Sequence, residues 1–240
     1  MNEVVDGIVL SQTDARENDV IINVYTSEYG QLAFYGRGLK KMTSKNAYAC
    51  QLFDYSEFLT DYNPNKSIQL LKSANLKKEY MGIKSDYDRI ALGSIITEII
   101  SQLEDDTLMD LLMSTLDKLD GDEEPYLVFN LFVVEILNML GITPVVDGCV
   151  SCGDTTHIET ISLEDGGFLC HDCNKLSHLR PVDVKMLRKF RIINKASFAV
   201  YDKIRNMDMN DPQLTKYLMD FLIMHSGMNL KSYRSLSTLG

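Results

Sequence analysis

The sequence predicts an α+β protein of several domains, in which a β-barrel precedes an α-helical domain that carries a four-cysteine knuckle between helices. Short runs rich in β-branched and aromatic residues fill residues 1–80, and apolar residues recur at helical spacing after residue 81. Four of the five cysteines fall between residues 149 and 173. The 240 residues are enough for two or three small domains with cores of their own.

The predicted barrel has short strands that are separated by turns rich in Asp, Asn, Gly and Pro. The strands are expected at residues 7–10, 20–25, 31–35, 55–60 and 68–72. Strands this closely spaced, within about 75 residues, are typical of a small barrel. An OB-fold fits the pattern, and an SH3-like barrel would fit it nearly as well.

The helical part of the chain is punctuated by residues that favour helix ends. Pro125 suits the first turn of one predicted helix, and Gly141 suits its end. Asp211 followed by Pro212 predicts the start of the last long helix. We assign the apolar stripes of these helices to core packing. The predicted domains are residues 1–80 for the barrel, 81–148 with 174–240 for the helical domain, and 149–173 for the knuckle.

The net charge of −10 is concentrated in one segment. Residues 81–148 carry a net charge of −11, whereas residues 1–80 carry −1 and residues 149–240 carry +2. Both ends can therefore present basic surfaces, and such asymmetry bears on partners rather than on the fold. No basic leader and no apolar run of roughly 20 residues is visible, so we expect a cytoplasmic protein without membrane contact.

The strongest chemical signal is the spacing C-x2-C-x17-C-x2-C, formed by Cys149, Cys152, Cys170 and Cys173. Two residues between paired cysteines let both thiolates reach one ion from a tight turn. Four thiolates complete a tetrahedral shell and leave no open position for water or substrate, so we predict a structural Zn²⁺ site. Two disulfides or four free thiols are the alternative, which a reducing cytoplasm disfavours.

A second candidate site is a basic segment within residues 29–53, a stretch that contains no acidic residue. The cations that we assign to nucleic-acid binding are Arg37, Lys40, Lys41 and Lys45. Lysine and arginine neutralise phosphates, while neighbouring aromatic rings can stack on bases. The competing interpretation is a solvated, mobile loop. A further cluster of seven Lys and Arg residues at 175–195 can either bind phosphate or balance the acidic segment.

Several segments, taken in their order along the chain, resemble the RecO family of DNA repair proteins. They are residues 6–10, 17–19, 27–31, 36–41, 141–144 before the first cysteine pair, and 233–239. The resemblance covers nearly the whole chain. It implies an N-terminal OB-fold that binds nucleic acid, a helical domain and a zinc knuckle.

The resemblance also implies a function as a recombination mediator. Such a protein binds single- and double-stranded DNA, anneals complementary strands, and helps to load RecA recombinase onto strands coated by single-stranded DNA-binding protein. The implied partners are RecR and the acidic C-terminal tail of that binding protein, and the implied location is the cytoplasm, at the nucleoid.

No enzymatic activity is expected, because the sequence shows no nucleophile–base arrangement, paired-carboxylate motif or nucleotide-binding loop. The alternative to a DNA-binding mediator is a zinc-containing adaptor that binds proteins but not DNA. Under that alternative the acidic segment and the knuckle support docking, and the basic segment is incidental. DNA binding that weakens with salt discriminates between the two functions.

Overall fold

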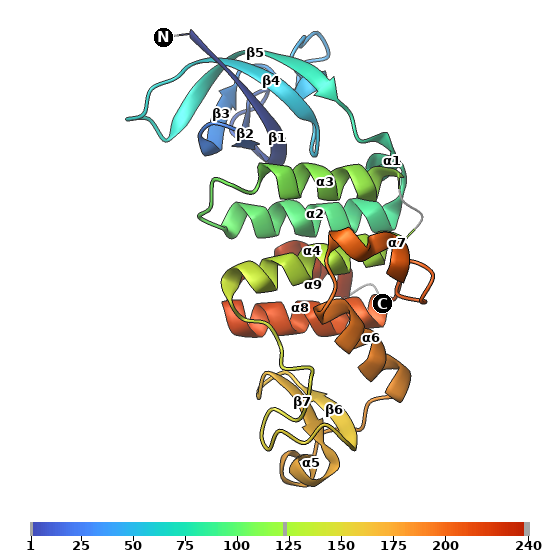
Figure 1. Cartoon of the computed structure of the whole chain (residues 1–240). Helices are drawn as coiled ribbons and strands as arrows, with labels where there is room; N and C mark the ends of the chain where they lie inside the picture. Colours follow the sequence, from blue (N-terminus) through green and yellow to red (C-terminus); the bar gives the residue numbers. More distant parts are fainter. Residues whose placement is uncertain (1, 122–123, 238–240) are drawn as a thin grey trace. The chain divides into compact units, whose positions relative to one another are not determined.

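The computed structural model describes residues 2–121 and 124–237 (Figure 1). Met1 of the predicted barrel, and residues 122, 123 and 238–240 of the predicted helical domain, lie outside the described residues. The chain forms two compact units. Unit 1 holds the described residues up to Gly121 and from Leu230 onward, and unit 2 holds those from Glu124 to Asn229. The predicted domain boundaries stay a prediction.

Unit 1 begins with a closed five-stranded barrel, which confirms the predicted strands. The strands are β1 (Asn2–Asp14), β2 (Val20–Thr26), β3 (Gly30–Gly36), β4 (Tyr55–Asp61) and β5 (Ile68–Lys78). Their order around the barrel is β1-β2-β3-β5-β4, with β3 and β5 parallel and the other pairs antiparallel. A five-stranded barrel with such a crossover is consistent with an OB-fold. A bulge between Val9 and Ser11 bends β1, which pairs with both β2 and β4.

The barrel core is built from side chains that alternate along the strands. Phe34 and Phe58 are fully buried and stack with their ring centroids 5.4 Å apart. Leu39 belongs to the loop after β3, yet its side chain is buried in the same core. The absence of a Cβ at Gly36 leaves room for the Leu39 side chain, with which a Cβ would collide. The barrel core therefore anchors the start of the loop after β3, called here the basic loop (residues 37–45).

Helices complete unit 1 (Figure 1). They are the 3-10 turn η1 (Tyr48–Cys50) and the helices α1 (Met81–Ser85), α2 (Tyr87–Gln102), α3 (Met109–Gly121) and α9 (Lys231–Ser237). The buried Tyr25 hydroxyl of β2 donates to the Asp105 carbonyl at 2.5 Å and accepts from the Leu108 N–H at 2.9 Å. The Glu98 carboxylate of α2 accepts the first two backbone N–H groups of α9, at 2.9 and 2.8 Å.

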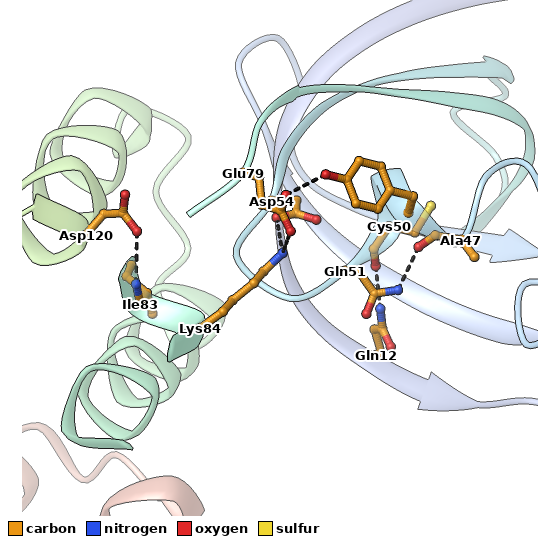
Figure 2. A network of polar contacts seen from close by, with 10 residues as sticks. Gln12, Ala47, Cys50, Gln51, Asp54, Glu79, Ile83, Lys84 and Asp120 are labelled. Carbon is orange, nitrogen blue, oxygen red and sulfur yellow. Dashed lines mark hydrogen bonds and ion pairs between the residues drawn. The ribbon is translucent and has the colours of Figure 1, made fainter. Parts of the chain in front are cut away.

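A buried ion pair joins the barrel to α1 (Figure 2). The Asp54 side chain is fully buried, and the Lys84 ammonium donates to it at 2.5 Å and to Glu79 at 3.2 Å. The second Asp54 oxygen has no hydrogen-bond partner among the described residues. Burial raises the pKa of the Asp54 carboxyl above its ordinary value, and the hydrogen bond from Lys84 opposes that rise. Asp54 therefore depends on Lys84 for charge compensation.

Replacing Lys84 with methionine should destabilise unit 1 by about 3 kcal/mol at neutral pH, because the change leaves a buried carboxylate without its counterion. The pKa of Asp54 is higher in the folded than in the unfolded protein, so protonation of this carboxyl stabilises the fold. This stabilisation is complete at a pH below the unfolded pKa, and it is lost as the pH rises through the folded pKa. The deficit of the variant should therefore shrink as the pH falls from about 7.5 to about 5. Urea denaturation across that range measures both effects.

The matched control is Lys77→Met, which removes a lysine that forms an ion pair with Asp6 on the surface of the barrel. Exposed pairs contribute less than about 1 kcal/mol, so this variant should unfold close to the wild type. Equal losses in the two variants would contradict the importance of the buried pair.

Unit 2 is a helical core with a small hairpin at one end (Figure 1). Its elements are α4 (Pro125–Leu140), β6 (Ile158–Ser162), β7 (Gly167–Cys170), α5 (His171–Ser177), α6 (Val184–Asn194), the 3-10 turn η2 (Phe198–Val200), α7 (Tyr201–Ile204) and α8 (Pro212–Ser226). Gly141 ends α4 with a φ of 68°, and the Asp211 carboxylate caps α8, as predicted. Of the helices that the structure describes, none is long and apolar enough to span a membrane.

A polar pair lies inside the core of unit 2. The buried Thr215 hydroxyl of α8 donates to the Asn130 side-chain oxygen of α4 at 2.7 Å. Leu127 of α4 and Leu214 and Leu218 of α8 are fully buried as well. A buried hydrogen-bonded pair in an apolar interface favours one register of the two helices over others.

Candidate metal centre and nucleic-acid interface

The four cysteines of the predicted zinc site come from two turns of unit 2. Cys149 and Cys152 lie between α4 and β6, Cys170 ends β7, and Cys173 lies in the first turn of α5. The Cys149 carbonyl accepts from the Gly153 N–H at 2.8 Å, which closes the first turn. Gly153 has a φ of 78°, a conformation that glycine adopts without strain.

The sulfur atoms are close enough to bind one metal ion. All four lie within 4.8 Å of one another, and Cys152 Sγ is 3.7 Å from Cys170 Sγ. Four thiolates at about 2.3 Å from a tetrahedral ion would be separated by roughly 3.8 Å, so the donor set fits. Cys149 and Cys170 are buried, Cys173 is half-buried, and Cys152 is exposed. The cluster thus lies at the edge of the knuckle, with a buried inner side.

The backbone around the cluster favours thiolate over thiol at Cys149. Burial alone would raise the pKa of the Cys149 thiol, but hydrogen bonds from the backbone N–H groups of Cys170, Cys152 and Ser151 outweigh burial and lower the pKa. Metal ligands must be deprotonated, and these N–H groups favour the thiolate at Cys149, whereas the hydrogen bond with Cys152 raises the pKa of the Cys173 thiol.

A second group of polar contacts braces the knuckle beside the sulfur cluster. The Glu159 carboxylate of β6 contacts His171 Nδ1 at 2.8 Å and accepts from the Asn174 amide at 2.7 Å. These contacts, Asn174 first, lower the pKa of Glu159. The Asn174 side chain also accepts from the Leu179 N–H at 3.0 Å. His171 therefore contacts Glu159 and ties α5 to β6.

The basic segment of the barrel lines a cavity of about 650 Å³. Four cations contribute to its wall: Arg16, Arg37, Lys41 and Lys45. Within the described part of the chain, none of them lies within ion-pair distance of a carboxylate. Asp19 is the acidic residue in the wall, so the cavity carries an excess of positive charge. Such a surface attracts phosphate groups.

The loop after β3, which carries Arg37, Lys41 and Lys45, is held in place. The Gly38 N–H donates to the Asp19 carboxylate at 2.8 Å, and the Tyr35 hydroxyl donates to the same group at 2.5 Å. These two bonds, Tyr35 first, lower the pKa of Asp19. The Lys40 N–H donates to the Asn18 carbonyl at 3.1 Å. Together with the buried Leu39 side chain, these contacts argue against the mobile-loop interpretation.

Three of the four predicted nucleic-acid contacts line the cavity, and one does not. Arg37, Lys41 and Lys45 belong to the wall. Lys40 is outside it and pairs with Asp14 at 2.5 Å. The role of all four in binding stays a prediction, but the surroundings of Lys40 differ from those of the other three.

Sequence reasoning missed Arg16, which lies in the turn between β1 and β2. Val20 pairs with Gly36 across β2 and β3, so the chain before β2 and the chain after β3 leave the barrel at the same point. The signal was present in the sequence, because a hairpin centred on the turn at 27–29 places residues 19 and 37 side by side. Arg16 lies among acidic residues in the sequence, so it is not part of a run of basic residues.

The second basic cluster, at residues 175–195, is largely neutralised. Lys189 bridges Asp208 and Asp211 at 2.9 and 2.7 Å, while Arg191 and Lys195 share Asp147 at 2.8 and 2.6 Å. Much of this cluster therefore balances acids of unit 2.

Cys50, the cysteine outside the motif, is buried in the barrel core. Burial, assisted by the nearby Asp54 charge, raises the pKa of its thiol to about 12. A thiol with so high a pKa is a poor nucleophile and a poor metal ligand, so Cys50 serves as a packing residue.

The described residues thus form a five-stranded barrel with a cation-lined cavity, a set of helices, and a cluster of four cysteines that could hold a metal ion. This combination defines a multidomain protein with a candidate anion-binding surface and a candidate metal site. Family models described as Recombination protein O N terminal and Recombination protein O C terminal match residues 1–80 and 84–234. The chain therefore belongs to the RecO family of DNA repair proteins.

Relatives in this family align over nearly the full chain. The DNA repair protein RecO of Halalkalibacterium halodurans is 26% identical over 240 residues, covering 98% of this chain and 94% of the relative. The DNA repair protein RecO of Listeria welshimeri is 28% identical over 243 residues, covering 96% and 92%. These matches confirm the resemblance that the sequence segments indicated.

Proposed function

We propose that the protein is a DNA-binding recombination mediator whose barrel binds the phosphate backbone through the basic cavity. The observation that carries this proposal is the group of four cations in the wall. Arg37, Lys41 and Lys45 belong to the loop after β3, which the barrel core and Asp19 hold in place, and Arg16 belongs to the turn between β1 and β2. A loop backbone that is fixed before binding loses little conformational entropy when phosphates arrive. The cations release condensed counterions from the strand, and this release drives binding.

Backbone contacts of this kind do not depend on sequence, so they serve both single and double strands. Annealing then needs no catalytic residue, because base pairing supplies the free energy once two strands are held together. We accordingly propose that the protein has no enzymatic activity of its own. Membership of the family supports loading of RecA onto strands coated by single-stranded DNA-binding protein as its task. It likewise supports RecR and the acidic tail of that binding protein as partners.

We further propose that the ion held by the four cysteines is Zn²⁺ and that its role is structural. Four thiolates at the separations found here match the preference of zinc for tetrahedral sulfur ligands. The Cys149, Cys152, Cys170 and Cys173 side chains would fill all four positions. Bound zinc would join the two cysteine turns and thereby stabilise the β6–β7 hairpin against unfolding.

The proposal is tested by fluorescence anisotropy of labelled single-stranded DNA, titrated with the protein at several salt concentrations. Tight binding at low salt that weakens steeply as salt rises is expected, because each phosphate contact releases counterions. Strand annealing, followed with complementary labelled strands, would then proceed without ATP. Absence of binding even at low salt would overturn the proposal in favour of a protein-binding adaptor.

A further inference from the structure

The basic loop holds a methionine, Met42, whose side chain is fully exposed to solvent. Leu39 and Met42 are three residues apart, yet Leu39 is 7% exposed and Met42 is 104% exposed. Among the large apolar side chains that the structure describes, Met42 is the most exposed, and Leu176 follows at 85%. A single exposed methionine has no meaning by itself. Met42, however, lies beside the cation-lined cavity.

Met42 lies between two residues of the cavity wall. Lys41 and Thr43 both line the cavity, whereas Met42 does not. The Lys41 N–H donates to the Gly38 carbonyl at 3.1 Å, and the Ser44 N–H donates to the Lys41 carbonyl at 2.9 Å. These backbone bonds fix the turn on both sides of Met42. The backbone at Met42 is therefore held between two residues of the cavity wall, while its side chain is exposed beside the cavity.

The charge around Met42 decides which ligand can reach it. Residues 29–53 contain no acid, so this surface selects a polyanion. A polyanion that also offers flat apolar faces is a nucleic acid with unpaired bases. The thioether of methionine is flexible and polarisable and packs well against aromatic rings.

We propose that Met42 packs against the face of an unpaired base while the cavity cations bind the adjoining phosphates. This inference rests on the proposed function and names the form of DNA that the site favours. Phosphate contacts are available on duplex and single strands alike, but the face of a base is accessible only where the strand is unpaired. Met42 thus adds affinity for single strands to a site that otherwise tolerates both.

The test compares two probes of equal charge, an oligonucleotide of about 20 thymidines and an abasic strand of the same length. The variants are Met42→Ala, Met42→Leu and, as a matched control, Met207→Ala, which removes a 53% exposed methionine from unit 2. Met42→Ala should weaken thymidine binding by about threefold to tenfold and leave abasic binding unchanged. Its salt slope should equal that of the wild type, because no charge is removed.

Met42→Leu should restore most of the affinity, since leucine keeps the apolar bulk, and Met207→Ala should bind as the wild type does. Unchanged thymidine binding by Met42→Ala, or equal weakening on both probes, would overturn the inference while salt-dependent binding still upheld the proposed function. Failure of the wild type to bind either probe would overturn both. Because Met42 makes no buried contact, all variants should melt at the wild-type temperature.

Discussion

Replacing Cys149 with serine should remove the bound metal and unfold the knuckle. The side chain is buried and is one of four sulfur atoms within 4.8 Å of one another, so the remaining three cannot complete the shell. Structural zinc contributes about 10–16 kcal/mol to the folding of small zinc modules, far more than the β6–β7 hairpin can recover by itself. Elemental analysis should show about one zinc per wild-type chain and almost none in the variant.

Hydrogen exchange locates the damage. Amides of β6, β7 and α5 should lose protection in Cys149→Ser, and a chelator should produce the same pattern in the wild type. Cys50→Ala is the control, because Cys50 packs inside the barrel and should leave metal content and knuckle protection unchanged. A Cys149→Ser protein that retained its zinc and its protected hairpin would contradict the four-cysteine site.

Removing the four cavity cations should nearly abolish single-strand binding at physiological salt. The salt slope is the decrease in log K per unit of log salt concentration, and each phosphate contact on a single strand adds about 0.7 to it. A variant with Arg16, Arg37, Lys41 and Lys45 changed to alanine should therefore have a salt slope smaller by about 2.8. At about 0.1 M salt, that difference in slope corresponds to roughly 600-fold weaker binding. The four side chains are exposed or lie at the cavity wall, so folding should be unaffected. Anisotropy titrations at several salt concentrations give the slope directly.

Two control variants distinguish phosphate binding by the cavity cations from a general effect of positive charge. Lys40→Ala removes a cation that already pairs with Asp14, so its slope should change by less than about 0.7. A variant lacking Arg180, Lys185 and Arg188 removes exposed cations of unit 2 that lie outside the cavity, and its slope should match the wild type. A cavity variant whose slope equals that of the wild type would show that these four side chains do not contact phosphates.

Much of the fold could be predicted from the sequence, because local patterns controlled it. Burial alternates along β4 and the first part of β5, and turn residues separate the barrel strands. Helices α4 and α8 begin and end at residues that the sequence marks as helix ends. The cysteine motif was predictable for the same reason, since two short spacings determine which sulfur atoms can meet.

The parts that escaped prediction depend on contacts between distant segments. The hydrogen bond between the Tyr25 hydroxyl and the Leu108 N–H is one such contact, because no local pattern relates two residues so far apart in the chain. Arg16 joined the cavity only through the pairing of β2 with β3. The neutralisation of Lys189 by Asp208 and Asp211 likewise follows from the packing of α6 near the start of α8.

The position of α9 has a consequence for biosynthesis. This helix belongs to unit 1, where Glu98 receives its first N–H groups, yet it follows the whole of unit 2 in the sequence. Because domains fold as units while the chain emerges from the ribosome, unit 2 can complete its core while unit 1 still lacks a helix. The barrel is therefore synthesised first, but the unit that contains it is finished last. Until then, the surface of α2 that receives α9 stays open to other partners, chaperones among them.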